Sequence, residues 1–380
     1  MDEQRIPLSE PNLSGNEEKY VTDAIKQGWV STSGAYIDRF ESELAAYVKT
    51  KHAVACQSGT AGLHLALLAL KVAAGQEVIV PSLTFIAAVN PVRYVGAEPV
   101  FMDCDDTLCM DMYKLERFCR EECRLLNGKL VNITSGKHVS TVIVVHVFGN
   151  LADMERLMDI AGEFNLNVVE DATEALGSRF FAGRYSGRYA GTIGHVGVYS
   201  FNGNKIITTG GGGMVVANDE MAEHIRYLST QAKTDPVYFV HGDVGYNYRM
   251  TNVQAAIGIG QLERLEKFID HKKEMYEFYR SCGIALLPFR EDTRPNYWFY
   301  CHLSQNRDGL IEYLEKNGIQ SRPIWHLINK LPMYLSNQSY LIEKAEYYWQ
   351  HVVNIPCSTN LTYTQAERVA EHIVDHQKEV

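Results

Sequence analysis

A single lysine, Lys205, stands between a short apolar run that ends at Phe201 and four consecutive glycines, Gly210 to Gly213. A lysine amine can form an imine with a carbonyl compound, and burial lowers the pKa of the ammonium group so that the neutral, nucleophilic amine becomes available. Lysine can also bind a phosphate or serve as a plain surface charge. The spacing matches neither the GxxxxGK[ST] phosphate loop nor the GxGxxG dinucleotide fingerprint. The stretch alone therefore leaves the role of Lys205 open.

A second polar segment, residues 56–61, leads from a predicted strand directly into a predicted helix. The first N–H groups of a helix are free, and Gly59 lets the backbone come close to a ligand. Together with the hydroxyls of Ser58 and Thr60, these groups suit a phosphate. Taken alone, a plain Ser/Thr helix cap is the simpler explanation.

Asp171 follows a third predicted strand, residues 166–170. Its carboxylate could hold a positive ring nitrogen or cap the next turn, and in isolation the two roles are equally good. A phosphate cradle, a strand-end aspartate and a lysine 34 positions later are together the three anchors of pyridoxal phosphate. They would bind its phosphate, its pyridine nitrogen and its aldehyde. The combination predicts pyridoxal 5'-phosphate as the cofactor.

The elements that must position these residues alternate between strand and helix from residue 52 onward. The pattern predicts strands at 52–56, 77–81, 98–103, 141–147, 166–170, 195–201 and 214–216, with helices at 61–70, 85–94, 112–126 and 154–164 between them. This alternation is typical of a mostly parallel sheet with helices on both faces, a three-layer α/β/α fold. Ligands of such sheets bind at the carboxyl ends of the strands, where the polar segments lie.

The pattern changes after Gly258, where helices at 262–279, 307–317 and 364–375 surround a short strand at 301–303. A chain of 380 residues also exceeds the roughly 250–300 residues that one hydrophobic core usually holds. We therefore predict a large cofactor-binding domain, residues 1–258, which includes an N-terminal arm. Residues 259–380 would form a smaller C-terminal α+β domain.

The composition excludes several classes of function. The net charge of −10 is spread along the chain without a basic block, so nucleic acid and membrane surfaces are poor partners. Eight cysteines without CxxC spacing predict free thiols in a reducing compartment, and we expect no metal site. The N-terminal residues lack the apolar core of a signal peptide, and no apolar run approaches the ~20 residues of a spanning helix. We expect a soluble, cytoplasmic protein.

At these residues the chain resembles the DegT/DnrJ/EryC1/StrS sugar aminotransferases, which have the aspartate-aminotransferase fold (fold type I of the pyridoxal phosphate enzymes). The resemblance runs from Pro7 to near Pro356. The matching motifs are Ser58-Gly59-Thr60-Ala61, Pro81-Ser-Leu-Thr-Phe85, Glu170-Asp171-Ala172 with Leu176-Gly177, Ser200-Phe201 before Lys205, Thr208-Thr209-Gly210, and the run from Gly245 to Gly258.

The resemblance implies a role for individual residues. Lys205 would be the catalytic, Schiff-base lysine and Asp171 the partner of the pyridine nitrogen. Phe85 would stack on the cofactor ring, and Glu174 would lie near its phenolic oxygen. The remaining cofactor-binding residues would be Gly59, Thr60 and Ser200 at the phosphate, with Asn247 reaching the phosphate of a neighbouring subunit. The last role implies a homodimer with shared active sites.

Members of this family use L-glutamate as amino donor and a nucleotide-linked keto-sugar as acceptor. The segment 321–334 is similar to the LegC-like branch, whose members aminate C4 of UDP-4-keto-6-deoxy-N-acetylglucosamine-type sugars for bacillosamine or legionaminic-type products. The UDP-linked sugar is the expected acceptor, and a dTDP-, GDP- or CDP-linked keto-sugar, aminated at C3 or C4, is the alternative. Arg249, Arg322 and Trp325 are the expected substrate contacts. Gly211 stands where the family commonly has glutamate, which would widen the pocket.

Two other functions fit the resemblance less well. Dehydratase relatives have histidine in place of the anchoring lysine, and Lys205 argues against that reaction. A non-catalytic binding or regulatory protein on the same fold would be expected to have lost one of the cofactor anchors, and all of them are present.

Overall fold

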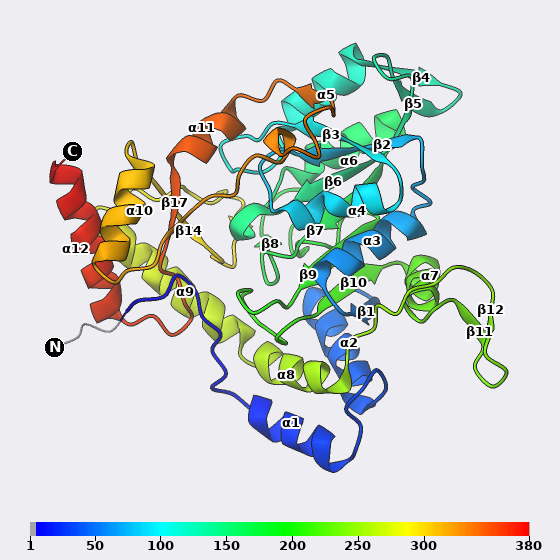
Figure 1. Ribbon diagram of the computed structural model, residues 1–380, viewed down its shortest axis with the longest axis horizontal. Coiled ribbons are helices and arrows are strands. Elements are labelled where there is room, and N and C mark those ends of the chain that lie inside the picture. The colour runs from blue at the N-terminus through cyan, green and yellow to red at the C-terminus, as the bar shows by residue number, and fades with distance from the viewer. Residues whose placement is uncertain (1–4, 380) are drawn as a thin grey trace.

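The computed structural model describes residues 5–379 and is built around one large sheet with helices on both faces (Figure 1). In spatial order its main strands are β1 (His52–Cys56), β10 (Gly213–Ala217), β9 (Val196–Ser200), β7 (Asn167–Asp171), β6 (His138–Val145), β2 (Gln76–Pro81), β3 (Glu98–Met102) and β16 (Ser339–Tyr340). Every pair from β9 to β16 is parallel, whereas β10 is antiparallel to both of its neighbours. The predicted, mostly parallel sheet is confirmed.

The two faces of this sheet bury two separate cores, because successive side chains of a strand point to opposite faces. In β2, Val78 and Val80 pack into one core and Ile79 into the other. The first core is covered by α3 (Gly59–Ala69), α4 (Asn90–Tyr94) and α7 (Asp219–Ser229). The second is covered by α2 (Ala35–Val48), α5 (Met112–Glu121), α6 (Met154–Phe164) and α8 (Asn252–Leu262). The three-layer α/β/α architecture is thereby confirmed.

One predicted helix, residues 112–126, is wrong over its second part. Helix α5 ends at Glu121, and the chain then forms a hairpin of β4 (Cys123–Leu126) and β5 (Lys129–Asn132). The turn between them is Asn127-Gly128, and both residues have positive φ, 50° and 75°. Asn-Gly is the favoured pair for a two-residue hairpin turn, so the local turn chemistry overrides the helical pattern.

Two further predicted helices are interrupted. Residues 85–94 form the 3₁₀ turn η1 (Ile86–Ala88) followed by α4, which begins around Pro91, a residue tolerated only in the first turn of a helix. The predicted helix at 262–279 is α9 (Leu265–Ser281), separated from α8 by Glu263 and Arg264.

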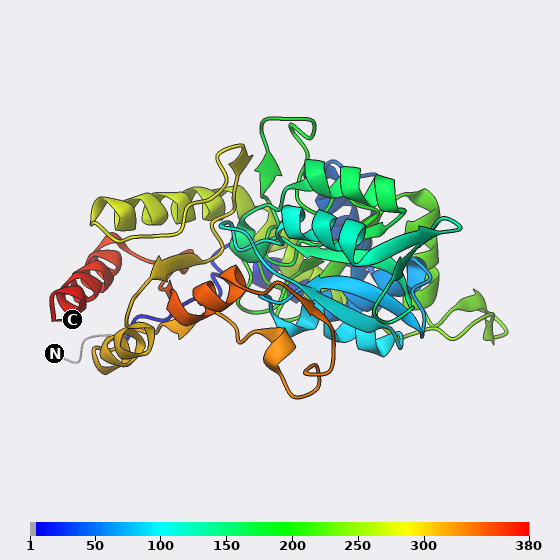
Figure 2. The same ribbon diagram turned by 90° about the horizontal axis from the view of Figure 1, so that it is seen from above.

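The C-terminal part of the chain forms a smaller α+β unit beside the large sheet. A three-stranded antiparallel sheet, β14 (Tyr300–Leu303), β17 (Val352–Ile355) and β15 (Arg322–Pro323), lies with α9, α10 (Arg307–Lys316), α11 (Lys344–His351) and α12 (Tyr363–Glu379). The first and the last described residues lie on this same side of the molecule (Figures 1 and 2).

Two segments pass across the predicted domain division at 258/259. Near the N-terminus, Ile6 bridges to Ile319, and Cys357 N donates a hydrogen bond to Leu8 O at 2.9 Å. In the other direction, β16 joins the edge of the large sheet beside β3. The division stays a prediction, with these two exchanges linking its halves.

A hairpin of β11 (Lys233–Asp235) and β12 (Val240–His241) extends away from the body, at the end opposite the chain termini (Figure 2). Its tip is apolar and exposed, with Val237, Tyr238 and Phe239 each more than 70% accessible. Within residues 5–379, no helix combines the length and apolar character that crossing a membrane would require. The eight cysteines, all within these residues, are unpaired, as expected.

Candidate active site

A cavity of about 340 Å³ lies where the N-terminus of α3 meets the carboxyl ends of β7 and β9. It brings together residues from all three polar segments that the sequence predicts to be functional. Its lining residues include Ser58, Gly59, Thr60, Thr84, Phe85, Asp171, Thr173, Glu174, Ser200, Asn202, Lys205, Gly211, Trp298 and Trp325. The cavity lies at the carboxyl ends of strands, where the sequence predicts the site.

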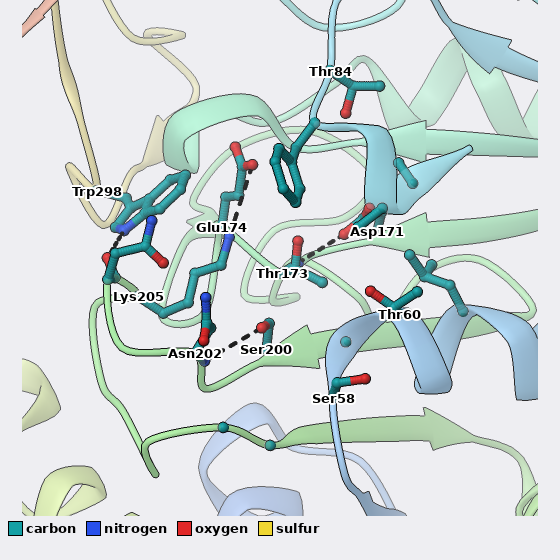
Figure 3. Close-up of a pocket in the computed structure, with 18 of the residues that line it drawn as sticks. Ser58, Thr60, Thr84, Asp171, Thr173, Glu174, Ser200, Asn202, Lys205 and Trp298 are labelled. Atoms are coloured by element: carbon teal, nitrogen blue, oxygen red, sulfur yellow. Dashed lines mark hydrogen bonds and ion pairs between the residues drawn. The ribbon is translucent and has the colours of Figure 1, made fainter. Parts of the chain in front are cut away.

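Lys205 lies in the loop between β9 and β10. The loop is closed at its base by hydrogen bonds from Thr209 N to Phe201 O and from Phe201 N to Gly212 O, both at 2.9 Å. The Lys205 side chain is only 12% exposed, and its Nζ lies 3.9 Å from Oε1 of Glu174 (Figure 3). Burial lowers the pKa of the Lys205 ammonium, while the charges of Glu174 and Asp171 oppose the shift. The neutral amine therefore forms at a lower pH than for a surface lysine.

Glu174 is buried in the turn that follows β7. Its Oε2 accepts a hydrogen bond from the backbone N–H of Phe148 at 2.8 Å. Burial raises the pKa of the Glu174 carboxyl to about 7, because the charged form loses its hydration, and Lys205 opposes this rise. The Glu174 carboxyl therefore changes protonation state near neutral pH, directly beside the Lys205 amine.

Asp171 is the last residue of β7, and its neighbour Glu170 has a different task. The Glu170 carboxylate accepts hydrogen bonds from His146 at 2.9 Å and from the backbone N–H of Gly191 at 2.8 Å. Although burial opposes it, these bonds lower the pKa of Glu170, which acts as a structural anion. Asp171 lines the cavity instead, because adjacent strand residues face opposite ways.

The Asp171 carboxylate has less support from the protein than Glu170. Its Oδ1 accepts a hydrogen bond from Thr173 N at 3.1 Å, so Asp171 does cap the following turn (Figure 3). Burial nevertheless raises the pKa of the Asp171 carboxyl, while the hydrogen bond from Thr173 and the charge of Lys205 oppose the rise. A cation placed against the Asp171 carboxylate would favour its ionised form.

The N-terminus of α3 combines a helix cap with a narrow cradle. Ser58 Oγ accepts a hydrogen bond from Ala61 N at 3.1 Å, as an N-cap does. A Cβ on Gly59 would lie 2.9 Å from both Ser200 Cβ and Thr173 Cγ2, and one on Gly213 would lie 2.6 Å from the Ser58 carbonyl carbon. Glycine at these two positions lets β10 and the β9 loop close around the first turn of the helix. The cap and the cradle therefore coexist.

The aromatic wall of the cavity comes from three segments. Phe85 is 51% exposed, and its ring centroid lies 6.4 Å from that of Trp325. Trp298 is buried, and its ring centroid lies 4.0 Å from Lys205 Nζ. Phe85 and Trp325 are thus placed at the cavity as the sequence predicts.

Asn247, Arg249 and Arg322 do not line this cavity. Asn247 is exposed beyond the β11–β12 hairpin, and its Oδ1 accepts a hydrogen bond from Arg249 Nε at 3.1 Å. Arg322 is exposed on β15. The predicted roles of these three residues remain predictions, and that of Asn247 requires a second subunit.

Several lining residues were not among the predicted site residues. Thr84 lies within the quoted motif at 81–85, but the sequence assigns it no role. Trp298 stands in an aromatic run, 297–300, for which core packing is the better expectation from sequence. Trp298 is in fact both buried and part of the cavity wall. Gly211 also lines the cavity, and a Cβ there would meet only Gln254 Nε2, at 3.8 Å, so the position has room for a side chain.

The residues present fit pyridoxal phosphate. Thr84 Oγ1 is buried without a hydrogen-bond partner, which suits a ligand with polar groups. The Gly59 cradle offers helix N–H groups to a phosphate, Asp171 offers a buried carboxylate, and the ammonium of Lys205 has a lowered pKa. These are the hydrogen-bond donors for the phosphate, the anion for the ring nitrogen and the amine for the aldehyde that the cofactor needs.

Comparisons with known proteins agree with this site. The profile of the DegT/DnrJ/EryC1/StrS aminotransferase family matches residues 11–374. The chain is 38% identical over 386 residues to GDP-perosamine synthase of Vibrio cholerae, covering 98% of this chain and 99% of that protein. It is 35% identical to EpsN of Bacillus subtilis, which is named as a pyridoxal phosphate-dependent aminotransferase, covering 97% of this chain and 95% of EpsN.

The fold is shared with solved structures of the same kind. DesV from S. venezuelae superposes with a TM-score of 0.88 at 27% identity, covering all of both chains. The family profile spans nearly the whole chain, and the relatives match along their full length. The chain therefore belongs to the DegT/DnrJ/EryC1/StrS aminotransferase family and is a pyridoxal phosphate-dependent aminotransferase that acts on nucleotide sugars.

Proposed function

We propose that the chain transfers the amino group of L-glutamate to the C4 ketone of a nucleotide-linked 4-keto-6-deoxy sugar, with Lys205 as the catalytic residue. The observation that best supports this proposal is the shared cavity of Lys205, Asp171 and Glu174 beside the α3 cradle. Pyridoxal phosphate supplies an aldehyde that takes up the amino group and a ring that accepts electrons when a proton leaves the substrate carbon.

The side chains that line the cavity have separate roles in this proposal. The neutral Lys205 amine, favoured by burial, accepts a proton from one carbon and returns it to another. Asp171 holds a positive ring nitrogen, which compensates the cost of burying its own charge. The helix N-terminus with Gly59, Thr60 and Ser200 holds the phosphate, while Phe85 offers a ring face.

The nucleotide of the acceptor is proposed to be GDP rather than UDP. The support is the relative with the printed name GDP-perosamine synthase, which matches this chain from end to end at 38% identity. This favours the GDP alternative over the UDP-linked sugar that the segment 321–334 suggests. Arg322 and Trp325 lie in that segment, and we propose them, with Arg249, as contacts to the acceptor.

The catalytic proposal is tested with Lys205→Ala. Turnover of glutamate should fall by roughly 10²–10⁴-fold or more, because both the covalent anchor and the proton carrier are lost. Lys51→Ala, an exposed lysine paired with Asp219, serves as control and should keep wild-type turnover. Full activity in the Lys205 variant would rule out the assignment.

The acceptor is tested by supplying glutamate with GDP-, UDP-, dTDP- and CDP-linked 4-keto-6-deoxy sugars. Formation of 2-oxoglutarate and of the amino sugar is followed by mass spectrometry. The proposal predicts a kcat/KM at least about tenfold higher for the GDP sugar, a difference of about 1.4 kcal/mol in transition-state binding. A preference for the UDP sugar would instead support the LegC-like reading.

The assembly is proposed to be a homodimer with shared active sites, located in the cytoplasm. Asn247 is exposed and does not line the cavity of its own chain, and the apolar tip formed by Val237, Tyr238 and Phe239 stays exposed among the residues that the structure describes. An exposed apolar tip of this kind is typical of an interface. The unpaired cysteines support a reducing compartment.

A further inference from the structure

Trp298 contacts the lysine loop in two ways. Its Nε1 donates a hydrogen bond to the backbone carbonyl of Asn204 at 2.7 Å, directly before Lys205 (Figure 3). Its ring face lies 4.0 Å from Lys205 Nζ. The indole is 3% exposed, so both contacts are shielded from water. One side chain therefore touches both the backbone and the amine of the catalytic loop.

Asn296, two residues before Trp298, holds the backbone of Glu174, whose carboxylate pairs with Lys205. Its Nδ2 donates hydrogen bonds to the backbone carbonyls of Glu174 at 2.9 Å and Leu176 at 3.0 Å. Its Oδ1 accepts a hydrogen bond from Trp298 N at 3.0 Å. Asn296 is fully buried, and all the polar atoms of its side chain are satisfied. The turn that carries Glu174 is thus tied to the residue that holds the lysine loop.

The segment around these residues is fixed at both ends. Before it, β13 (Thr293–Arg294) pairs with β8 (Arg179–Phe180), which follows the Glu174 turn. After it, β14 enters the small antiparallel sheet. The segment between β13 and β14 therefore bridges the β7 turn, the β9 loop and the C-terminal unit, and it has little freedom to move independently.

We propose that Asn296 and Trp298 are positioning residues that form a clamp, setting the distance between Lys205 Nζ and the Glu174 carboxylate. The proposal rests on the proposed function in that it takes Lys205 as the catalytic amine. Asn296 fixes the backbone of Glu174, and Trp298 fixes the backbone of Lys205 and presents a ring face to its amine. The distance between a proton-carrying amine and the reacting carbon must be set within a fraction of an ångström. The clamp therefore affects the rate of the reaction rather than the binding of glutamate.

Trp298→Phe separates the two contacts, because phenylalanine keeps a ring face but lacks the N–H donor. The rate of the glutamate half-reaction should fall by roughly 10- to 100-fold with KM for glutamate unchanged. The pH profile for chemical labelling of Lys205 in the cofactor-free protein should remain in place. Trp298→Leu also removes the ring face, which favours the ammonium form, and should move that labelling profile to lower pH.

The matched control is Trp349→Phe. Trp349 also has a lysine over its ring, Lys330 at 5.2 Å, but lies in α11 outside the cavity. This variant should change neither the half-reaction nor the labelling of Lys205. If Trp298→Phe behaves like Trp349→Phe, the clamp is refuted.

The coupling within the clamp is tested with Asn296→Ser alone and combined with Trp298→Phe. Because both residues act on the same pair, the double variant should lose little more rate than the worse single variant. Losses that multiply, or that follow a fall in melting temperature, would show a merely structural role. Labelling of Lys205 needs no sugar substrate, so this test does not depend on the identity of the acceptor. The clamp can be refuted although the wild-type protein transfers amino groups, and it can be supported although the proposed sugar is wrong.

Discussion

At the scale of single residues, the site depends on burying opposite charges in one cavity. Glu174 and Lys205 lie 3.9 Å apart with little exposure, so neither charge is fully solvated. Burial disfavours both charged forms, which raises the carboxyl pKa and lowers the ammonium pKa. A carboxyl that titrates at about pH 7 beside an amine of lowered pKa suits the proton transfer that we propose for Lys205.

This arrangement predicts a pH-dependent stability. The folded protein binds more protons at Glu174 than the unfolded chain does between pH 4.5 and about 7, so its unfolding free energy falls as pH rises through that range. Glu174→Gln removes the effect. From pH 5 to pH 8, the cofactor-free variant should gain stability relative to wild type by up to about 3 kcal/mol.

The measurement is urea unfolding at several pH values. Glu223→Gln, at an exposed carboxylate on α7, is the control and should differ from wild type by a constant amount. A constant difference for Glu174→Gln as well would mean that Glu174 titrates normally in the folded protein.

At the scale of elements, the first turn of helix α3 contributes to the stability of the fold and also lines the cavity proposed to bind the cofactor phosphate. Ser58 Oγ caps the helix by accepting from Ala61 N, and the same turn lines the cavity. The sequence could not choose between a cap and a phosphate cradle, since both use a hydroxyl before a glycine. The structure shows the cap, which engages one N–H group of a helix end that offers several, so the proposed phosphate site remains compatible with it.

A substitution at Ser58 separates the two roles. Aspartate is as good an N-cap as serine, so Ser58→Asp should keep the unfolding free energy within about 0.5 kcal/mol, whereas Ser58→Ala should lose about 1 kcal/mol. The added negative charge should weaken binding of the phosphate-bearing cofactor by roughly tenfold or more. Unfolding by urea and titration with pyridoxal phosphate measure the two quantities.

The N-cap of α7 provides the control. Asn218 accepts a hydrogen bond from Met221 N and lies outside this cavity. Asn218→Asp should leave both stability and cofactor affinity unchanged. Equal cofactor affinity in Ser58→Asp and wild type would show that the helix end is only a cap.

At the scale of the whole molecule, the proposed homodimer involves the exposed hairpin and Asn247, which does not line the cavity of its own chain. The β11–β12 hairpin extends from the body at one end of the molecule, as Figure 2 shows. A twofold dimer would use the same surface of both chains and could place the Asn247 of each against the cradle of the other.

Mixed dimers test this sharing. Lys205→Ala and Asn247→Ala should each be inactive or strongly impaired as homodimers. When the two are unfolded and refolded together in equal amounts, half of the dimers should be mixed, with one intact site each, giving roughly a quarter of wild-type activity. Activity that never exceeds the mean of the two parents would refute shared sites.

The sequence alone determined the sheet architecture and the cofactor, and it singled out the three segments that line the cavity. Strand and helix periodicity act over a few residues, so the alternation from residue 52 to 217 is readable directly. Lys205, Asp171 and the segment 58–60 follow strands, and parallel topology gathers strand ends at one edge. Local reasoning failed at 112–126, where the turn signal at Asn127-Gly128 outweighed a helical pattern.

Only the tertiary structure decided which side chains complete the site. Trp298 contacts a residue 94 positions away, and no local pattern marks such a contact. Its neighbours 297 and 299 are equally aromatic, so packing alone selects the indole that faces Lys205. The burial that shifts the pKa values of Glu174 and Lys205 likewise comes from the whole fold, because desolvation depends on every segment that closes over a charge.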